Sequence, residues 1–157
     1  MEDKQKGYMH RAIELSINNI KLGGGPFGAV IVKNGKIISG GTNKVTIKND
    51  PTAHAEIEAI RTASKKLKTF DLKDCEIYTS CEPCPMCLSA IYWANIKKIY
   101  FANSRRDAGK IKFRDDHIYN EIAKPVDKRK IKTVQILRDE AIKAFRLWSE
   151  NPFKTQY

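Results

Sequence analysis

The sequence predicts an α/β fold, a three-layer α-β-α sandwich around a central mixed sheet of five strands. Helical and strand-like segments alternate in the order α-β-β-α-β-α-β-α-β-α, which favours helices on both faces of one sheet. The chain has 157 residues, of which 41% are apolar and 30% charged, enough for one domain with its own core. It contains no internal repeat, low-complexity tract or linker, so residues 1–157 are expected to form a single domain.

The first predicted elements are a helix and a hairpin. Apolar side chains recur at helical spacing over residues 4–21, and three glycines followed by a proline end this helix. Residues 27–32 are a short apolar run that suits a buried strand. The Asn34-Gly35 dipeptide is typical of a two-residue hairpin turn, so residues 36–41 are predicted to pair with that strand.

Helices and strands keep alternating after residue 50. An Asp-Pro-Thr turn precedes a predicted helix over residues 53–67, which Thr52 or a neighbour is expected to cap. A proline in the first turn favours another helix at residues 85–94. The remaining elements follow from their apolar patterns. Strands are expected at residues 75–79, 98–102 and 131–137, and helices at residues 115–122 and 140–149.

The cysteines are clustered in the middle of the chain. The N-terminus carries acidic residues and is not followed by an apolar stretch, so no export signal is expected and a cytoplasmic location is predicted. No apolar run is long enough to span a membrane. Disulfides are rare in the cytoplasm, and clustered cysteines there are more often metal ligands or redox groups. The four are Cys75, Cys81, Cys84 and Cys87.

A zinc site is predicted from His54, Cys84 and Cys87. A His-Ala-Glu segment begins at His54, and a Pro-Cys-Pro-Met-Cys segment places Cys84 thirty positions later. This combination is the signature of zinc nucleobase deaminases. The two cysteines lie three apart at a helix start, which puts both sulfurs on one face near the positive end of the helix. Three protein ligands leave a fourth position for a water or hydroxide, so one catalytic Zn²⁺ per subunit is expected.

Glu56 lies in the same helical turn as His54 and is the predicted proton carrier. Its carboxylate can take a proton from the activated water, hand it to a ring nitrogen and then to the leaving amine. One alternative is a closed structural site in which Cys81 is the fourth ligand. Cys81 is expected to end a strand and to face elsewhere, and a structural site has no need of Glu56. Cys75 and Cys81 are therefore predicted to be small buried side chains.

Several stretches carry a family resemblance. They are residues 24–32, 49–56, 78–88, 90–94 and 115–125, together with the terminal Tyr157. In these stretches the chain resembles the cytidine deaminase superfamily and, within it, the bacterial guanine deaminases. The resemblance implies a cytidine deaminase-like fold and the hydrolysis of guanine to xanthine and ammonia. It also implies a homodimer in which the C-terminal segment, about residues 138–157, is swapped onto the partner subunit.

The resemblance also implies substrate-binding residues. Asn43 would hydrogen-bond the purine ring, Phe27 would line the pocket, and Asp115 would meet the polar edge of guanine or assist proton transfer. Tyr157 would reach the pocket from the partner subunit. Each residue also has a purely structural explanation. Asn43 can form a turn, Asp115 can cap a helix, Phe27 can belong to the core, and a terminal tyrosine can be frayed.

Other functions remain open from the sequence. The net charge is +11, with a basic loop at residues 104–112 and a Lys-Arg-Lys run at residues 128–130, and such charge suits RNA as well as a solvated surface. A tRNA-specific adenosine deaminase is therefore one alternative, and a guanosine or other nucleoside deaminase is another. A non-catalytic zinc-binding interaction module is a third, although it would not need Glu56. A generic charged surface is favoured over a nucleic-acid partner, because no aromatic residues alternate with the charges.

Overall fold

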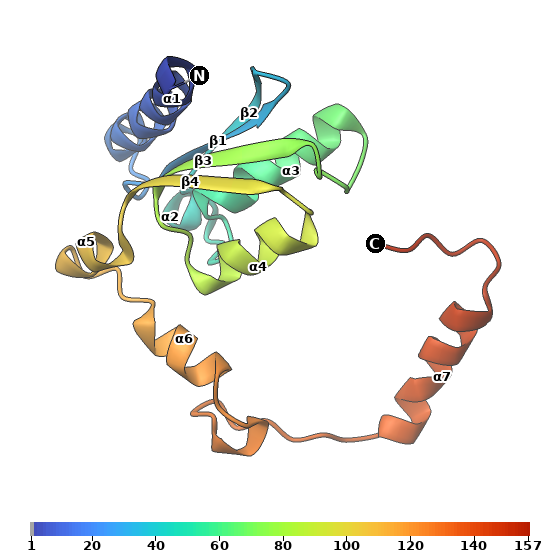
Figure 1. Ribbon diagram of the computed structural model, residues 1–157. Coiled ribbons are helices and arrows are strands. Elements are labelled where there is room, and N and C mark those ends of the chain that lie inside the picture. Colours follow the sequence, from blue (N-terminus) through green and yellow to red (C-terminus); the bar gives the residue numbers. More distant parts are fainter. Residues whose placement is uncertain (1) are drawn as a thin grey trace. The chain divides into compact units, whose positions relative to one another are not determined.

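The computed structural model describes residues 2–157, and the chain divides into two units after Asp115 (Figure 1). The first unit holds the sheet and most of the helices. The positions of the two units relative to each other are not determined, so each is described by itself. The helices of the first unit are α1 (Glu2–Lys21), α2 (Val45–Lys48), α3 (Ala55–Leu67), α4 (Pro85–Trp93) and α5 (Arg105–Lys110), and its strands are β1 (Gly28–Lys33), β2 (Lys36–Thr42), β3 (Cys75–Cys81) and β4 (Lys98–Asn103).

The sheet has four strands in the order β2-β1-β3-β4. Strand β1 runs antiparallel to both β2 and β3, and β4 runs parallel to β3, so the sheet is mixed as predicted. The β1–β2 hairpin turns at Asn34 and Gly35, whose φ angles of 51° and 73° are the positive values that this tight turn requires.

The prediction of a fifth strand is wrong for the chain that the structure describes. Residues 131–137 form no strand, and β4 is the edge of the sheet. A strand is stabilised by the ladder it makes with a neighbour, and its apolar pattern does not specify where that neighbour is. The alternation of apolar residues in this segment was therefore not sufficient to predict sheet pairing.

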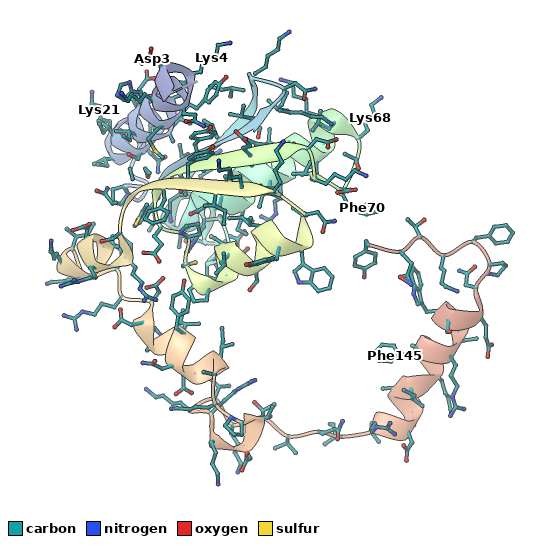
Figure 2. All side chains as sticks on the ribbon, viewed as in Figure 1. Asp3, Lys4, Lys21, Lys68, Phe70 and Phe145 are labelled. Carbon is teal, nitrogen blue, oxygen red and sulfur yellow. The ribbon has the colours of Figure 1, made fainter. Side chains whose placement is uncertain are left out.

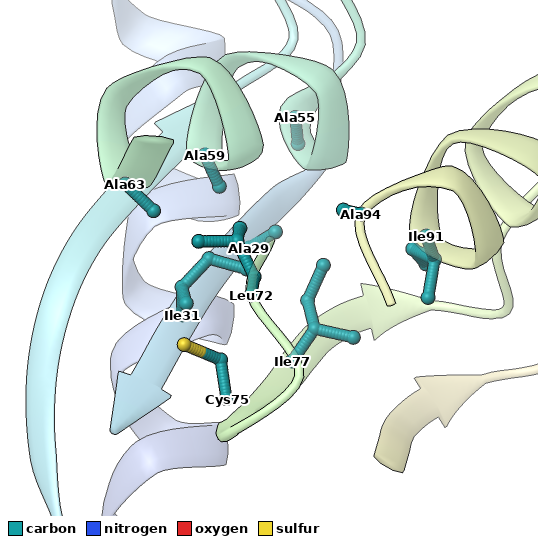
Figure 3. Close-up of a cluster of buried hydrophobic side chains, with 10 residues drawn as sticks. All are labelled: Ala29, Ile31, Ala55, Ala59, Ala63, Leu72, Cys75, Ile77, Ile91 and Ala94. Atoms are coloured by element: carbon teal, nitrogen blue, oxygen red, sulfur yellow. The ribbon is translucent and has the colours of Figure 1, made fainter. Parts of the chain in front are cut away.

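Helices cover both faces of the sheet, as the predicted three-layer sandwich requires. Successive side chains of β1 point to opposite faces. Ala29 and Ile31 join a buried cluster with α3, α4 and Ile77 of β3 (Figure 3). Val30 and Val32 join a second buried cluster against α1. Both faces of β1 are thus buried, which explains why its sequence is a continuous apolar run.

Close approach of α3 to β2 holds the first turn of α3 in place. Gly41 of β2 lies directly under this helix, and a Cβ atom at Gly41 would lie 2.1 Å from the Ala55 carbonyl oxygen and 2.5 Å from the Ala59 nitrogen. Only glycine permits such an approach without moving the helix. His54 immediately precedes α3, so this contact positions the part of the chain that carries the predicted zinc ligand.

The local structure around α3 corrects one predicted cap. Thr52 does not cap this helix, because its hydroxyl donates to the Asp50 carboxylate at 2.7 Å and stabilises the preceding turn. His54 occupies the N-cap position without a capping hydrogen bond from its side chain. Its imidazole is therefore available for another partner. The short helices α2 and α5 were not predicted, since each has only one or two turns and no apolar periodicity of its own.

The second unit consists of helices without a buried core. It contains α6 (Asp116–Ile122), a 3₁₀ turn at Val126–Lys128 and α7 (Arg138–Glu150), so both predicted helices are present. No side chain in residues 116–157 is buried. Most apolar side chains of α7 are exposed, and Phe145 is 73% exposed (Figure 2). No helix within residues 2–157 is both long and apolar enough to cross a membrane.

Candidate active site

The three predicted zinc ligands converge in the structure. His54 and Cys84 are the N-cap residues of α3 and α4, and Cys87 lies in the first turn of α4. Each of the two sulfurs lies 3.5 Å from Nδ1 of His54, and the three atoms lie within 4.8 Å of one another. Nitrogen and sulfur ligands at about 2.0 and 2.3 Å from a tetrahedral Zn²⁺ lie about 3.6 Å apart. The donor set and its spacing therefore fit zinc.

The electrostatics of this cluster favour the thiolate form of Cys84. A hydrogen bond from Cys87, a second one with His54 and the nearby His54 charge lower the pKa of Cys84 to about 4, against the opposing effect of burial. The hydrogen bond with Cys84 in turn raises the pKa of His54. Thiolates are the form in which cysteine binds metal. Two helix N-termini meet at the same point, and their partial positive charges stabilise anionic sulfur.

Glu56 lies beside the metal cluster in a buried position. Its side chain is only 6% exposed, and Thr79 of β3 donates a hydrogen bond to its Oε1 at 3.1 Å. Burial raises the pKa of Glu56, and hydrogen bonds from its own backbone amide, Cys87 and Thr79 partly oppose that rise. A buried carboxyl group with a raised pKa is suited to accepting and returning a proton. Thr79 was not predicted, because no sequence signal distinguishes it from other buried strand residues.

Cys81 is not part of the metal cluster. It ends β3 as predicted, is buried, and its thiol contacts the Ser104 carbonyl oxygen at 3.7 Å. Burial, followed by the negative charges of Glu56 and Asp115, raises the pKa of Cys81 to about 11. Its sulfur is not among the three ligand atoms of His54, Cys84 and Cys87 that lie within 4.8 Å of one another. Cys75 is also buried, at the start of β3, so both predictions of small buried cysteines are confirmed.

The backbone brings Asn43 close to the first turn of α3. The amide of Lys44 donates to the Ala53 carbonyl oxygen at 2.8 Å, which ties the residue after Asn43 to the residue before His54. Asn43 is buried, and its Oδ1 accepts from the Val45 amide at 3.3 Å. Asn43 therefore does form the turn, through its side-chain oxygen. The hydrogen bond of this turn does not involve its side-chain nitrogen, Nδ2.

Phe27 and Asp115 lie on segments that reach the same region. The Phe27 carbonyl accepts from the Asn43 amide at 3.1 Å, and its ring packs against the core cluster that contains Ala55. The Phe113 ring meets Phe27 edge-on, with centroids 4.9 Å apart. Asp115, two residues further on, acts electrostatically on Cys81. Phe113 was not predicted, because a single aromatic residue in a basic loop carries no site signal.

The remaining predicted residue belongs to the second unit. Tyr157 ends the chain and is 77% exposed. Its predicted place in a partner subunit's pocket stays a prediction.

The fold and the site define a zinc-binding deaminase. The family described as "Cytidine and deoxycytidylate deaminase zinc-binding region" matches residues 2–103, which include the three ligand positions and Glu56. The chain belongs to this family and is a hydrolytic deaminase.

A bacterial guanine deaminase matches nearly the whole chain. It is 49% identical to the guanine deaminase of Bacillus subtilis (strain 168) over 151 residues, 96% of this chain and 97% of that one. A crystal structure of guanine deaminase from Bacillus subtilis superposes with a TM-score of 0.94 at 48% identity, covering 97% of this chain and 98% of that chain. The resemblance to bacterial guanine deaminases is therefore confirmed.

More distant relatives share part of this likeness. A tRNA-specific adenosine deaminase from Buchnera aphidicola is 42% identical over 101 residues, which are 64% of this chain and 62% of that one. A solved structure of a relative in complex with 2,6-diaminopurine has a TM-score of 0.69 at 36% identity and covers 71% of this chain and 62% of that chain. The likeness to the guanine deaminase extends through the C-terminal unit, and the likeness to this tRNA enzyme is partial.

Proposed function

We propose that this protein catalyses the hydrolytic deamination of guanine to xanthine and ammonia. The convergence of His54, Cys84 and Cys87 beside the buried Glu56 carries the chemistry. The full-length likeness to the Bacillus subtilis guanine deaminase supports guanine as the substrate. Purine salvage or catabolism is the corresponding role, and the predicted cytoplasmic location stays a prediction.

Each subunit is proposed to hold one zinc ion through Nδ1 of His54 and the sulfurs of Cys84 and Cys87. The bound ion would supply a water of lowered pKa as the nucleophile in the fourth ligand position. Glu56 accepts one proton of this water and donates it to a ring nitrogen, and it then transfers the second proton, from the new hydroxyl group at C2, to the departing amine. The water oxygen becomes the new carbonyl oxygen at C2 of the base, and the amine leaves as ammonia. Guanine and water are thereby converted to xanthine and ammonia.

Four residues are proposed to hold the base. The amide of Asn43 hydrogen-bonds the purine ring, and Phe27 packs against its face. Asp115 meets the polar edge of guanine or relays a proton to the leaving group. Tyr157 completes the pocket from the partner subunit. The placement of Asn43 next to the first turn of α3 and the electrostatic reach of Asp115 support the first unit's part in this arrangement.

A substrate panel tests the proposed function. The zinc-loaded protein is incubated with guanine, guanosine, adenine, cytosine and cytidine and with a tRNA anticodon stem-loop, and ammonia release is measured for each. Guanine is expected to react at least about a hundredfold faster than adenine, cytosine and cytidine, because a site that hydrogen-bonds a polar substrate group rejects analogues lacking it. Guanosine has the same polar base edge and reports whether the pocket admits a ribose. Xanthine formation is followed by absorbance. Absence of guanine turnover would refute the proposal, and inosine formation in the RNA would favour a tRNA-specific adenosine deaminase.

The protein is also proposed to form a homodimer with exchanged C-terminal segments. Residues 116–157 bury no side chain, although α7 and the segment before it carry many apolar ones. In the first unit, Tyr92 and Trp93 of α4 and Phe101 of β4 are at least half exposed. Apolar surfaces of this kind on both units are typical of a chain that is completed by another copy.

Complementation between two inactive chains tests the exchange. Glu56→Gln and Tyr157→Ala chains are co-expressed with different affinity tags, and the mixed dimer is purified through both. If Tyr157 serves the partner's site, each mixed dimer holds one intact site and shows about half the wild-type activity. If Tyr157 serves its own chain, both sites of the mixed dimer carry one lesion and activity stays at the level of the parents. A protein that elutes as a monomer would refute the dimer itself.

A further inference from the structure

Asn19, near the end of α1, is a buried polar residue that the proposed chemistry does not use. Its side chain is 2% exposed, and its Nδ2 atom donates two hydrogen bonds. One goes to the Gly25 carbonyl oxygen at 2.8 Å and the other to the Asn43 carbonyl oxygen at 2.7 Å. An amide nitrogen carries two hydrogens, so both are used on two separate segments of backbone.

The glycine-rich loop is shaped around this amide. A Cβ atom at Gly24 would lie 2.2 Å from Nδ2 of Asn19 and 2.6 Å from the Asn43 carbonyl oxygen. The position therefore has room for glycine alone while Asn19 keeps its two bonds. The Gly24 amide also donates to the backbone carbonyl of Asn19 at 3.0 Å. Asn19 thus contacts the loop through its side chain and through its backbone.

The two segments held by Asn19 carry the two proposed substrate contacts of the first unit. The Gly25 carbonyl that accepts from Asn19 also accepts from the Phe27 amide at 2.8 Å. The Phe27 carbonyl in turn accepts from the Asn43 amide at 3.1 Å. Asn19, Gly25, Phe27 and Asn43 therefore form a closed ring of hydrogen bonds. The backbone of Asn43 is held on its amide side by Phe27 and on its carbonyl side by Asn19.

We propose that Asn19 is a positioning residue for substrate binding, which sets the orientation of the Asn43 amide and the place of Phe27. This inference rests on the proposed role of Asn43 in holding the purine ring. Asn19 acts on Asn43 through the backbone, by donating to the Asn43 carbonyl oxygen. A buried side chain with two hydrogen bonds to backbone carbonyls fixes both segments at once, and a small displacement of a binding group weakens substrate affinity.

A double-mutant cycle tests the role of Asn19. Asn43→Ala is expected to raise KM for guanine about tenfold with little change in kcat, as loss of uniform binding does. Asn19→Asp keeps the shape of the side chain, removes both donors and places a carboxylate against two carbonyl oxygens. It is expected to raise KM about fivefold, which corresponds to one lost hydrogen bond to the substrate. In the Asn43→Ala background the same substitution should change KM less than about twofold.

The controls separate positioning from a general loss of stability. Asn19→Ala serves as a second variant in case the aspartate prevents folding. Ser16→Ala removes another buried hydrogen bond of α1, from the Ser16 hydroxyl to the Ile13 carbonyl, and does not touch the loop. It should lower the melting temperature and leave KM unchanged. Zinc content is measured for every variant and should equal that of the wild type.

Each outcome supports or overturns one part of the proposal. An unchanged KM in Asn43→Ala would remove the proposed role of Asn43, and with it the role of Asn19. A raised KM in Asn43→Ala together with an unchanged KM in both Asn19 variants would overturn the positioning role alone. Equal effects of Asn19→Asp in the wild-type and Asn43→Ala backgrounds would overturn the positioning of Asn43, because Asn19 would then act independently of Asn43.

Discussion

Replacing Glu56 with glutamine is expected to abolish guanine turnover and to leave zinc content unchanged. Glutamine has nearly the same volume and can still accept from Thr79, so the buried site keeps its shape. It cannot carry a proton between the water, the ring nitrogen and the leaving amine. General acid–base groups contribute about 10²- to 10⁴-fold, and one group serving several transfers should lie at the upper end. Single-turnover xanthine formation and zinc analysis of the same sample measure both quantities.

Glu58→Gln is the matched control for this substitution. Glu58 lies in the same helix, two residues further on, and its carboxylate pairs with Lys48 at 2.7 Å and Lys44 at 3.8 Å. Glu58→Gln makes the same chemical change as Glu56→Gln and leaves the residues of the zinc site unaltered. Activity close to the wild type is expected. Persistent activity in Glu56→Gln would show that another group carries the proton. Asp115 would be the first residue to examine, because its charge and that of Glu56 both raise the pKa of the Cys81 thiol.

Replacing Cys87 with alanine is expected to remove both zinc and activity. The sulfur of Cys87 is 3.5 Å from Nδ1 of His54, and its side chain is fully buried. In this variant only His54 and Cys84 remain as protein ligands for the four zinc positions. A site with two protein ligands binds zinc weakly. Loss of a metal ligand should lower zinc affinity and kcat by at least about a hundredfold, more than loss of an outer hydrogen-bond partner. Zinc per chain after dialysis and the melting temperature with and without added zinc report the result.

Cys81→Ala is the control within the same segment. Cys81 is buried three residues before Cys84, and its thiol contacts a backbone carbonyl outside the metal cluster. This variant should retain one zinc per chain and most of its activity, with at most a small loss of stability. If Cys81→Ala lost zinc as completely as Cys87→Ala, a closed structural site with four protein ligands would replace the catalytic one.

The zinc site could be predicted because its ligands are set by local structure. Cys84 and Cys87 are brought onto one face by a single helical turn, and Pro85 favours a helix start between them. His54 and Glu56 are related in the same way at the start of α3. Spacing along the chain therefore determined which residue types face the metal, and their chemistry indicated a proton-transferring zinc site. Most helices and strands were likewise predictable from apolar periodicity and turn residues.

The fifth strand is a feature that the sequence pattern predicted wrongly. Residues 131–137 have strand-like composition and no partner strand in the described chain, because strand pairing depends on segments that lie far away in the sequence. Thr52 is a smaller case, since its hydroxyl could serve the helix or the turn and the tertiary arrangement selected the Asp50 carboxylate. The surroundings of the proposed substrate residues Asn43 and Phe27 are a similar case, because the Asn43–Phe27 hydrogen bond and the Phe27–Phe113 ring contact join segments far apart in the sequence.

By itself, the sequence determined the reaction class and the alternation of helices and strands, because both are indicated by short motifs whose own residues lie within one or two turns of each other. Tertiary structure alone decided that two helix N-termini meet at one point, that Thr79 supports Glu56, and that Asn19 reaches both the glycine-rich loop and Asn43. These contacts join residues separated by more than a full element of secondary structure, with the exception of the Asn19–Gly25 bond. Burial of the sheet on both faces brings them together, and no local pattern encodes that packing.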